Sequence, residues 1–222
     1  FAGYVTGFPA DVTAFTAIGG FSGLKNALGM SPEEVIERVK DAHLRGRGGA
    51  GFDTGFKWST VPRDQPSYVV CNADEGEPGT FKDRYLLSGA PYLVLEGMLI
   101  AAYAVGAEQG YIYVRGEYPS IIDSLVDELD SMRANGFLGD KILGTDFSFD
   151  IEVMPGAGSY VVGDETALLS SLMGRRGYPL AKPPFPTERG LWDRPTVINN
   201  VETLACGPMI MTNGRDRLAA IG

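Results

Sequence analysis

Short apolar segments alternate with helical segments from residue 67 to residue 172, and this alternation most constrains the fold. The run "SYVVCNAD" (67–74) is typical of a buried strand, residues 91–107 of an apolar helix, and "GYIYVRG" (110–116) of another strand. The pattern continues with a helix from Pro119 to about Gly136, a strand over 147–154, and a helix that begins at about Asp164. Strands that alternate with helices pair in parallel through helical crossovers. The sequence therefore predicts a layered α/β domain with a parallel sheet flanked by helices.

The N-terminal region precedes this pattern. Residues 1–29 are rich in Gly, Ala and Thr without sustained periodicity, so we expect an extended segment there and a single domain over residues 30–222. Ser31 begins a capping box with Glu34, and Pro32 suits the first position of a helix. We expect this helix to end near residue 43.

A glycine-rich stretch, "RGRGGAGF", follows this helix. Gly46, Gly48 and Gly51 spell G-x-G-x-x-G, but a dinucleotide-binding turn of that type follows a strand, not a helix. The glycines let the backbone approach a bound group with its amides free to donate, and Arg47 and Lys57 add positive charge that suits a phosphate. On the motif alone, a structural turn fits equally well.

An acidic turn, "CNADEGEPGTFKDR", lies at the end of the predicted strand at 67–74. In open α/β sheets, ligands bind at the carboxyl ends of the parallel strands. Asp74, Glu75 and Glu77 are typical of a solvated loop. Alternatively, Asn72 offers donor and acceptor groups to a heteroaromatic ring. A carboxylate here would accept ribose hydroxyls and repel a 2′-phosphate, which would favour NAD over NADP.

Three further patterns are weak singly. Asp164 and Glu165 at a helix start either complement the helix dipole or form a polar wall beside a cofactor. Phe185, in the stiff segment "KPPFP", is either a core residue or a platform for an adenine ring. Asn199 and Asn200 are typical of turn and capping groups. Together with the glycine stretch, these patterns predict a site for a phosphorylated, ring-bearing cofactor and a nucleotide partner.

Composition excludes several other functions. The net charge of −9 opposes binding to a nucleic-acid backbone. The longest apolar run, "YLVLEGMLIAAYAVGA", contains Glu96 and is typical of a buried helix rather than a membrane span. With one histidine and two cysteines outside any C-x-x-C pair, we predict no metal site in this chain.

The combination of motifs resembles one family. "LRGRGGAGF", "CNADE" with "EPGTFKDR", "GAGSY" with "ETALL" and "GRRG", "KPPFP" and "NNVETL" occur in the order found in the NADH-binding flavoprotein subunit of respiratory complex I. Related diaphorase subunits occur in NAD-reducing hydrogenases, formate dehydrogenases and electron-bifurcating complexes. The resemblance covers roughly residues 19–210. It implies a Rossmann-like, FMN-binding domain in which FMN accepts hydride from NADH and passes electrons to an iron–sulfur cluster.

The resemblance also implies roles for residues of this chain, none of them a catalytic acid or base. Glu77 would reject NADPH. The residues expected to contact FMN are Gly46, Arg47, Gly48, Lys57, Asn72, Asp74, Glu75, Tyr160, Gly163, Asp164, Asn199, Asn200 and Thr203. Those expected to contact NADH are Phe52, Glu77, Glu165, Lys182 and Phe185.

Three residues depart from the family pattern: Asp164 replaces a glutamate, Asp53 a common proline, and Thr60 a second stacking phenylalanine of some relatives. We expect the family's β-grasp domain and its [4Fe–4S] domain to be absent from this chain. The expected partners are a thioredoxin-like [2Fe–2S] subunit and a larger iron–sulfur subunit. The expected location is the cytoplasm, the inner face of a membrane complex, or the mitochondrial matrix.

Two alternatives remain for the function. In the first, a diaphorase of the same family reduces NAD⁺ with electrons from hydrogen, formate or ferredoxin. In the second, which is supported only by Asp164 and the absent acceptor domain, the chain is a flavin- or nucleotide-binding structural subunit without turnover.

Overall fold

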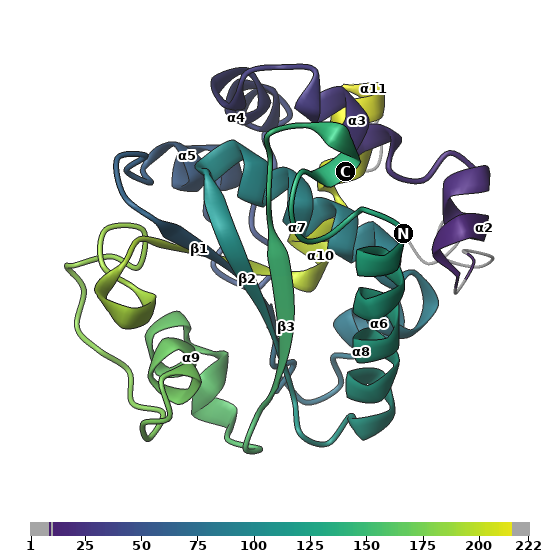
Figure 1. Cartoon of the computed structure of the whole chain (residues 1–222). Coiled ribbons are helices and arrows are strands. Elements are labelled where there is room, and N and C mark those ends of the chain that lie inside the picture. The colour runs from purple at the N-terminus through teal and green to yellow at the C-terminus, as the bar shows by residue number, and fades with distance from the viewer. Residues whose placement is uncertain (1–8, 10, 215–222) are drawn as a thin grey trace.

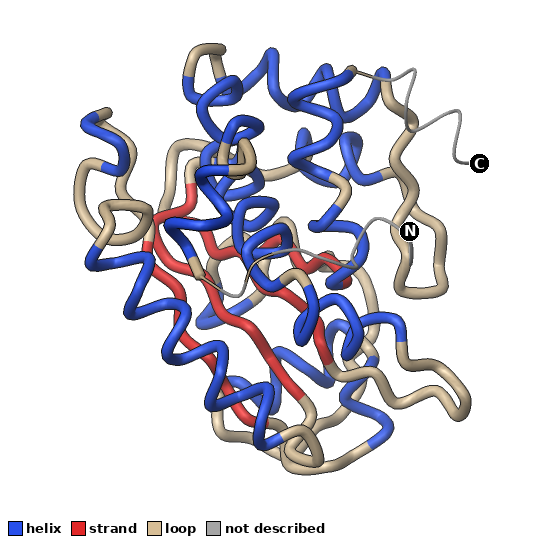
Figure 2. The backbone as a smooth tube through the Cα atoms, turned by 90° about the vertical axis from the view of Figure 1, so that its right-hand side faces the viewer, coloured by secondary structure: helices blue, strands red, loops and turns tan. Residues whose placement is uncertain are grey.

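A computed structural model describes residue 9 and residues 11–214. Its centre is a four-stranded sheet in which every neighbouring pair is parallel, with helices on both faces (Figures 1 and 2). The predicted α/β class is therefore confirmed. The order across the sheet is β3-β2-β1-β4, and the strands are β1 (Ser67–Ala73), β2 (Ala107–Val114), β3 (Asp150–Pro155) and β4 (Thr196–Asn200).

The strand order reverses beside β1. The chain passes from β1 to β2 and β3 in one direction across the sheet, whereas β4 returns to the opposite side of β1. The crossovers contain the helices α7 (Pro91–Val105) and α8 (Pro119–Ala134). In an open parallel sheet, loops diverge from such a reversal point and leave a crevice at the carboxyl ends of the strands.

Alternate residues of β1 enter two separate cores. Val69 and Cys71 belong to the larger core, which contains α7, whereas Val70 belongs to a smaller core with side chains of α9 (Glu165–Leu172). Successive side chains of a strand point to opposite faces, so a strand covered on both faces is apolar throughout. This explains the continuous apolar run that predicted β1.

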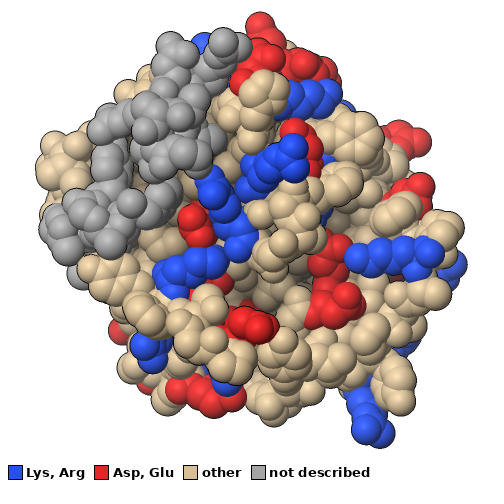
Figure 3. Space-filling model, turned by 180° about the vertical axis from the view of Figure 1, so that it is seen from behind, with Lys and Arg blue, Asp and Glu red and all other residues tan. Residues whose placement is uncertain are grey.

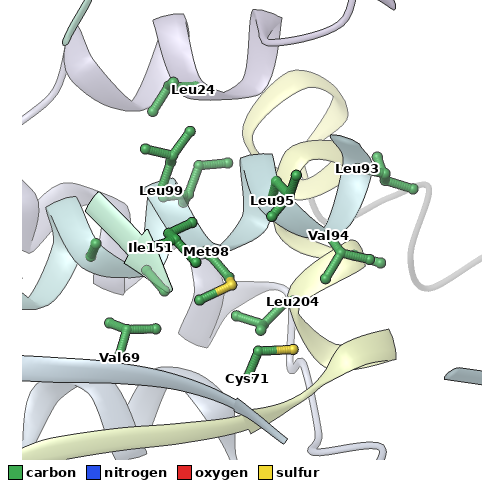
Figure 4. Packing of buried hydrophobic residues seen from close by; sticks show 14 of the residues in the cluster. Leu24, Val69, Cys71, Leu93, Val94, Leu95, Met98, Leu99, Ile151 and Leu204 are labelled. Atoms are coloured by element: carbon green, nitrogen blue, oxygen red, sulfur yellow. The ribbon is translucent and has the colours of Figure 1, made fainter. Parts of the chain in front are cut away.

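Helix α7 is the centre of the larger core. All its residues are buried except Tyr103, as expected of a helix enclosed on all sides. In Figure 4, Leu95, Met98 and Leu99 of α7 lie between Leu24 and the sheet. Among the described residues, no single helix is long and apolar enough to cross a membrane. Helices α6 (Lys82–Gly89) and α7 pass that test jointly, by length and composition, with a 98° bend between them.

Two helices that follow β4 pack on α7. They are α10 (Val201–Ala205) and α11 (Gly207–Asn213), and a Cβ atom added at Gly97 of α7 would lie 2.0 Å from the carbonyl oxygen of Leu204. The backbones of α7 and α10 therefore meet directly, because only glycine leaves room for the contact.

The expectation of an extended segment over residues 1–29 is wrong for its described part. The chain forms α2 (Val12–Ala17) and α3 (Ser22–Leu28), and α3 packs against α11 (Figure 1). Phe15 and Phe21 of this region are buried. Helices of six and seven residues are too short to show periodicity, and tertiary burial stabilises them instead. Residues 1–8 and 10 lie outside the described part.

The longer predicted helices are confirmed with small shifts at their ends. Helix α4 (Pro32–Asp41) begins with the predicted capping box between Ser31 and Glu34. Several short elements were not predicted as such: α5 (Thr54–Ser59), α6, β4, and the 3-10 turns η1 (Ile142–Gly144), η2 (Tyr160–Gly163) and η3 (Leu191–Asp193). Where β4 lies, we expected a proline-rich segment that leads directly into a helix.

A buried carboxylate joins α3 to α7. Glu96 is 2% exposed and accepts hydrogen bonds from the backbone amides of Phe21 (3.1 Å) and Leu24 (2.9 Å). Burial raises the pKa of Glu96 from 4.5 to about 7, although these amides oppose the shift. The group thus satisfies donors at the start of α3 but resists ionisation in the folded chain.

We predict that Glu96→Gln lowers the free energy of unfolding by about 1–3 kcal/mol at pH 5, because the glutamine amide cannot accept one of the two bonds. Since the pKa of Glu96 is higher in the folded than in the unfolded chain, its contribution to stability falls as the pH rises from about 4.5 to about 7. The difference from the parent chain therefore narrows by pH 8. Urea unfolding at both pH values measures it, with the exposed Glu108→Gln as control. An equal difference at both pH values contradicts the pKa assignment.

Candidate functional site

A cavity of about 710 Å³ lies at the carboxyl ends of β1 and β4, where the strand order reverses. This volume is within the range of pockets that bind cofactors. Its walls come from the glycine stretch, α5, the start of α9, the proline-rich segment and the start of α10. The lining residues are Gly46, Gly48, Ala50, Gly51, Phe52, Phe56, Lys57, Thr60, Asn72, Gly163, Asp164, Glu165, Lys182, Phe185, Pro186, Thr187, Glu188, Thr196, Ile198, Asn199, Asn200 and Thr203.

The glycine stretch forms a closed loop along one wall. The amide of Gly46 donates to the carbonyl of Phe52 at 2.8 Å, which closes the loop at its base. Gly49 and Gly51 have φ values of +114° and +63°, so other residues would strain the loop there. A Cβ added at Gly48 would lie 3.3 Å from the Cβ of Asn200. The loop therefore lies directly against the end of β4.

The same loop is attached to α10. The backbone amide of Arg47 donates to the hydroxyl of Thr203 at 2.9 Å. Arg47 itself is not among the cavity-lining residues, although its neighbours Gly46 and Gly48 are. The position of the loop thus depends on α10, which in turn packs on α7.

A chain of three charges crosses the cavity wall. Glu165 lies between Lys57 and Lys182, at nitrogen–oxygen distances of 2.8 and 2.9 Å. Burial alone would raise the pKa of Glu165, but the two ammonium groups outweigh it and lower the pKa below its usual value. Lys57 also donates to the carbonyl of Ile198 at 3.0 Å. The carboxylate is therefore ionised at neutral pH and holds both cations at the cavity.

Both ends of the Asn200 side chain are engaged. Its oxygen accepts from the amide of Glu202 (3.1 Å) and from Lys82 (2.9 Å), and its nitrogen donates to Asp83 (2.6 Å). Asn200 thus caps α10 and links β4 to the start of α6. Lys82 forms further ion pairs with Asp83 and Glu202.

Asn72 stands beside Asn200 because the two residues are register partners in the β1–β4 pair. Its nitrogen donates to the carbonyl of Gly163 at 3.1 Å, and its oxygen accepts from the amide of Asp74 at 3.1 Å. Asn72 therefore connects the end of β1 to the turn that precedes α9.

The three carboxylates of the acidic turn, Asp74, Glu75 and Glu77, are not among the residues that line the cavity. Glu75 accepts from the backbone amides of Asp83 (2.9 Å) and Arg84 (3.2 Å), so its carboxylate orders the start of α6. Glu77 accepts from the hydroxyl of Tyr160 at 2.6 Å, and both side chains are exposed. The acidic turn and η2 are joined by this bond.

Asp74 is buried in this turn. Its Oδ2 atom has no hydrogen-bond partner among the described residues. Burial raises its pKa to about 6, although the positive charge of Arg115 opposes the shift. A carboxyl group in this environment is suited to donate or accept a hydrogen bond, according to its protonation state.

Three phenylalanines at the cavity are about half exposed: Phe52, Phe56 and Phe185. The rings of Phe52 and Phe56 lie 5.9 Å apart and inclined at 62°. Exposed aromatic rings gathered at one pocket indicate a planar ligand that covers them. Phe56 was not predicted to be at the site, although its neighbour Lys57 was, because the helical position that brings it there was not predicted.

The three departures from the family pattern have local hydrogen-bond roles. Asp53 caps α5 through the amide of Phe56 (2.7 Å), and Asp164 caps α9 through the amides of Thr166 and Ala167 (2.9 and 3.2 Å). The third, Thr60, bonds to Thr187 at 3.0 Å, and both residues line the cavity.

The face opposite to that of Figure 1 carries acidic and basic side chains interspersed around a hollow (Figure 3). Neither sign of charge forms a continuous patch in this view. A site on a chain of net charge −9 thus depends on individually placed cations such as Lys57 and Lys182.

Comparison with known proteins gives matches over this same region. The family model of the "Nuo51 FMN-binding domain" matches residues 39–207. The chain is 52% identical over 205 residues to an NADH-quinone oxidoreductase subunit of Aquifex aeolicus, covering 92% of this chain and 48% of that protein. It is 52% identical over 203 residues to the alpha subunit of the NAD-reducing hydrogenase HoxS of Cupriavidus necator, covering 90% and 34%.

Solved structures agree with these relatives. An NAD⁺-reducing [NiFe]-hydrogenase in the air-oxidised state aligns with a TM-score of 0.75 and 37% identity, covering 95% of this chain and 35% of that one. The chain thus spans about half or less of the length of the proteins that it matches.

Asn200→Ala should lower the free energy of unfolding of the ligand-free chain by about 1–3 kcal/mol, because α10 loses its cap and the buried Asp83 loses a donor. Denaturant unfolding measures the effect. Asn213→Ala, at an exposed asparagine, is the control and should change stability by less than about 0.5 kcal/mol. Equal effects of the two substitutions would contradict the structural role of Asn200.

Proposed function

The chain belongs to the family of the Nuo51 FMN-binding domain, and we propose that it is the part of an NADH-oxidising electron-input subunit that binds FMN and NADH. The observation that carries this proposal is the cavity at the β1–β4 reversal, where the glycine loop, cations, amides and aromatic rings converge. Relatives named as subunits of NADH-quinone oxidoreductases and NAD-reducing hydrogenases support it.

The chemistry of the cavity fits FMN. The glycine loop and Lys57 offer hydrogen-bond donors and positive charge to a phosphate. Asn72 and Asn199 offer polar groups to the edge of a ring, and Thr203 fixes the loop beside them. We assign the FMN contacts to Gly46, Arg47, Gly48, Lys57, Asn72, Asp74, Glu75, Tyr160, Gly163, Asp164, Asn199, Asn200 and Thr203.

NADH is assigned to the outer part of the same cavity. Phe52 and Phe185 are exposed and suited to stack on planar rings. Lys182 and Glu165 would hold polar groups of the nucleotide, and Glu77 would exclude a 2′-phosphate by charge repulsion. When the nucleotide binds, the ion pair between Lys182 and Glu165 must open, or both side chains must bond to the nucleotide while they stay paired.

The protein contributes positioning rather than acid–base chemistry. A bound FMN supplies the acceptor for the hydride that NADH gives up. The side chains of the cavity would position the flavin and nicotinamide rings against each other, and the phenylalanines at the cavity would limit the access of water. Lys57 and Lys182 lower the pKa of Glu165, so its carboxylate is ionised at neutral pH and is available as a hydrogen-bond acceptor rather than as an acid.

The remaining electron path requires further redox groups. We propose a [4Fe–4S] cluster in a region beyond this chain, and a thioredoxin-like [2Fe–2S] subunit and a larger iron–sulfur subunit as partners. The coverage of half or less of each matched protein, and the multi-subunit complexes that their names denote, support this proposal. We place the complex in the cytoplasm, at the inner face of a membrane, or in the mitochondrial matrix.

A second function keeps the same site but reverses the electron flow. The similarity to subunits of NAD-reducing hydrogenases favours it, because these proteins deliver electrons to NAD⁺. The cavity serves either direction, since hydride transfer between two stacked rings is reversible. The neighbouring subunits decide between the two.

The proposal is tested by adding FMN and then NADH to the chain under anaerobic conditions. We expect FMN to bind and its visible absorbance to bleach when NADH is added. FMN that binds but keeps its absorbance would favour a subunit without turnover. A chain that binds no FMN would contradict both functions.

A substitution tests the selectivity. Glu77→Gln should lower the ratio of the dissociation constants of NADP⁺ and NAD⁺ about tenfold, equivalent to ~1.4 kcal/mol, because it removes one negative charge near the 2′-phosphate. Glu108→Gln is the charge-matched control, since it removes one negative charge at an exposed residue that does not line the cavity and should leave the ratio unchanged. An unchanged ratio in Glu77→Gln would exclude the role given to this residue.

A further inference from the structure

Asn199 is a buried side chain with one free end. It is 4% exposed, lines the cavity, and accepts a hydrogen bond through Oδ1 from Nε1 of Trp58 at 2.9 Å. Its Nδ2 atom has no hydrogen-bond partner among the residues that the structure describes. This atom is not among the fully buried side-chain atoms that lack a partner, so it is accessible from the cavity that Asn199 lines and can donate to a ligand there.

Trp58 determines which end of Asn199 is free. An indole nitrogen only donates, so it can bond only to the carbonyl oxygen of the carboxamide. The amide nitrogen must therefore occupy the end away from Trp58. This orientation follows from the chemistry of the partner, although the oxygen and nitrogen of a carboxamide have nearly the same shape.

The neighbouring Asn200 shows the contrast. Its oxygen faces Lys82 and the amide of Glu202, and its nitrogen faces Asp83. The two consecutive asparagines therefore have different roles. Asn200 links β4 to α6 and α10, whereas the amide of Asn199 is available to a ligand.

Two consecutive residues of helix α5 form hydrogen bonds with two consecutive residues of β4. Lys57 donates to the carbonyl of Ile198 at 3.0 Å, and Trp58 donates to the side chain of Asn199. Trp58 is 2% exposed and is enclosed in the larger core, so its indole has little freedom to move. The direction of its N–H is therefore fixed by packing.

We propose that Trp58 is a positioning residue for the bound flavin: it holds Asn199 with its amide directed to a hydrogen-bond acceptor of that ligand. This inference rests on the proposed FMN site. Trp58 touches no ligand itself and acts through Asn199. The acceptor belongs to the flavin ring and ribityl chain or to the phosphate, all of which offer suitable oxygen atoms.

The test begins with Trp58→Phe, which removes the indole N–H and keeps an aromatic ring. The affinity for FMN should fall about tenfold, because Asn199 loses its fixed orientation and the carbonyl can turn to the ligand. The matched control is Trp192→Phe at the other tryptophan of the chain, which is half exposed and does not line the cavity. Its affinity for FMN should be unchanged.

A double-mutant cycle separates positioning from a general loss of structure. If Trp58 acts through Asn199, then Trp58→Phe combined with Asn199→Ala should bind FMN no more weakly than Asn199→Ala alone. Additive losses would overturn the inference. Denaturant unfolding without FMN measures any loss of fold separately for each variant.

Asn199→Asp provides a second test in case Trp58→Phe fails to fold. The aspartate keeps an acceptor for Trp58 but replaces the amide by a carboxylate oxygen, so FMN affinity should fall about a hundredfold. Unchanged affinity would overturn the proposal. Repeating the titrations with riboflavin, which lacks the phosphate, distinguishes the sources of the acceptor: a retained loss assigns it to the ring and ribityl chain, and a loss confined to FMN assigns it to the phosphate.

Titration of the parent chain with FMN tests the proposed function separately from the role of Trp58. If it binds no FMN, the proposed function fails. If it binds FMN and Trp58→Phe binds FMN equally well, the site stands and the role of Trp58 is excluded.

Discussion

The parallel pairing of β1 with β4 is the interaction on which the rest of the site depends. Because β4 returns to the side of β1 away from β2, the loops after the two strands diverge and leave the cavity between them. The register places Asn72 beside Asn200 at its floor. The glycine loop and α5 then bond to α10 and the end of β4 across sequence separations of 156 and 141 residues. Without this pairing, the cavity would lose its floor and one wall.

Most polar side chains around the cavity satisfy each other, which limits what remains for a ligand. Glu165 neutralises much of the charge of Lys57 and Lys182, while Asn200 is occupied by Lys82 and Asp83. Such networks keep buried groups from being left unpaired, which would be costly. The groups still available are therefore few, and they are the ones that can impose selectivity. Backbone amides of the glycine loop and the amide of Asn199 are of this kind.

The long elements could be predicted from the sequence because each carries its own periodic signal. Helices α4, α7 and α8 and strands β1 and β2 contain enough residues for apolar spacing or capping to be recognised. Strand β4 has five residues and ends in two asparagines, so its sequence favoured a turn. Helices α2 and α3 are stable only through burial against distant segments, such as the contact of α3 with Glu96.

The site was predicted through motifs, and its internal connections were not. Most of the glycine loop, Lys57, Asn72, Glu165, Lys182 and the asparagine pair line the cavity, whereas five other residues predicted as ligand contacts do not: Arg47, Asp74, Glu75, Glu77 and Tyr160. The different uses of Asn199 and Asn200 depend on Trp58 and Asp83, which are 141 and 117 residues away in sequence. No local pattern records such a pairing. These pairings follow only from the three-dimensional fold, in which the sheet places the partners next to each other.

The backbones of α7 and α10 approach closely at Gly97, so the packing of the core and the shape of the cavity are coupled there. Any side chain at Gly97 would displace the backbone of Leu204 and with it Thr203, which holds the glycine loop. A substitution in the apolar core, at a residue that does not line the cavity, would thus change the shape of the cavity. Because Gly97 is buried in the central helix of the larger core, the same substitution would also destabilise the fold, so loss of stability and distortion of the cavity would occur together.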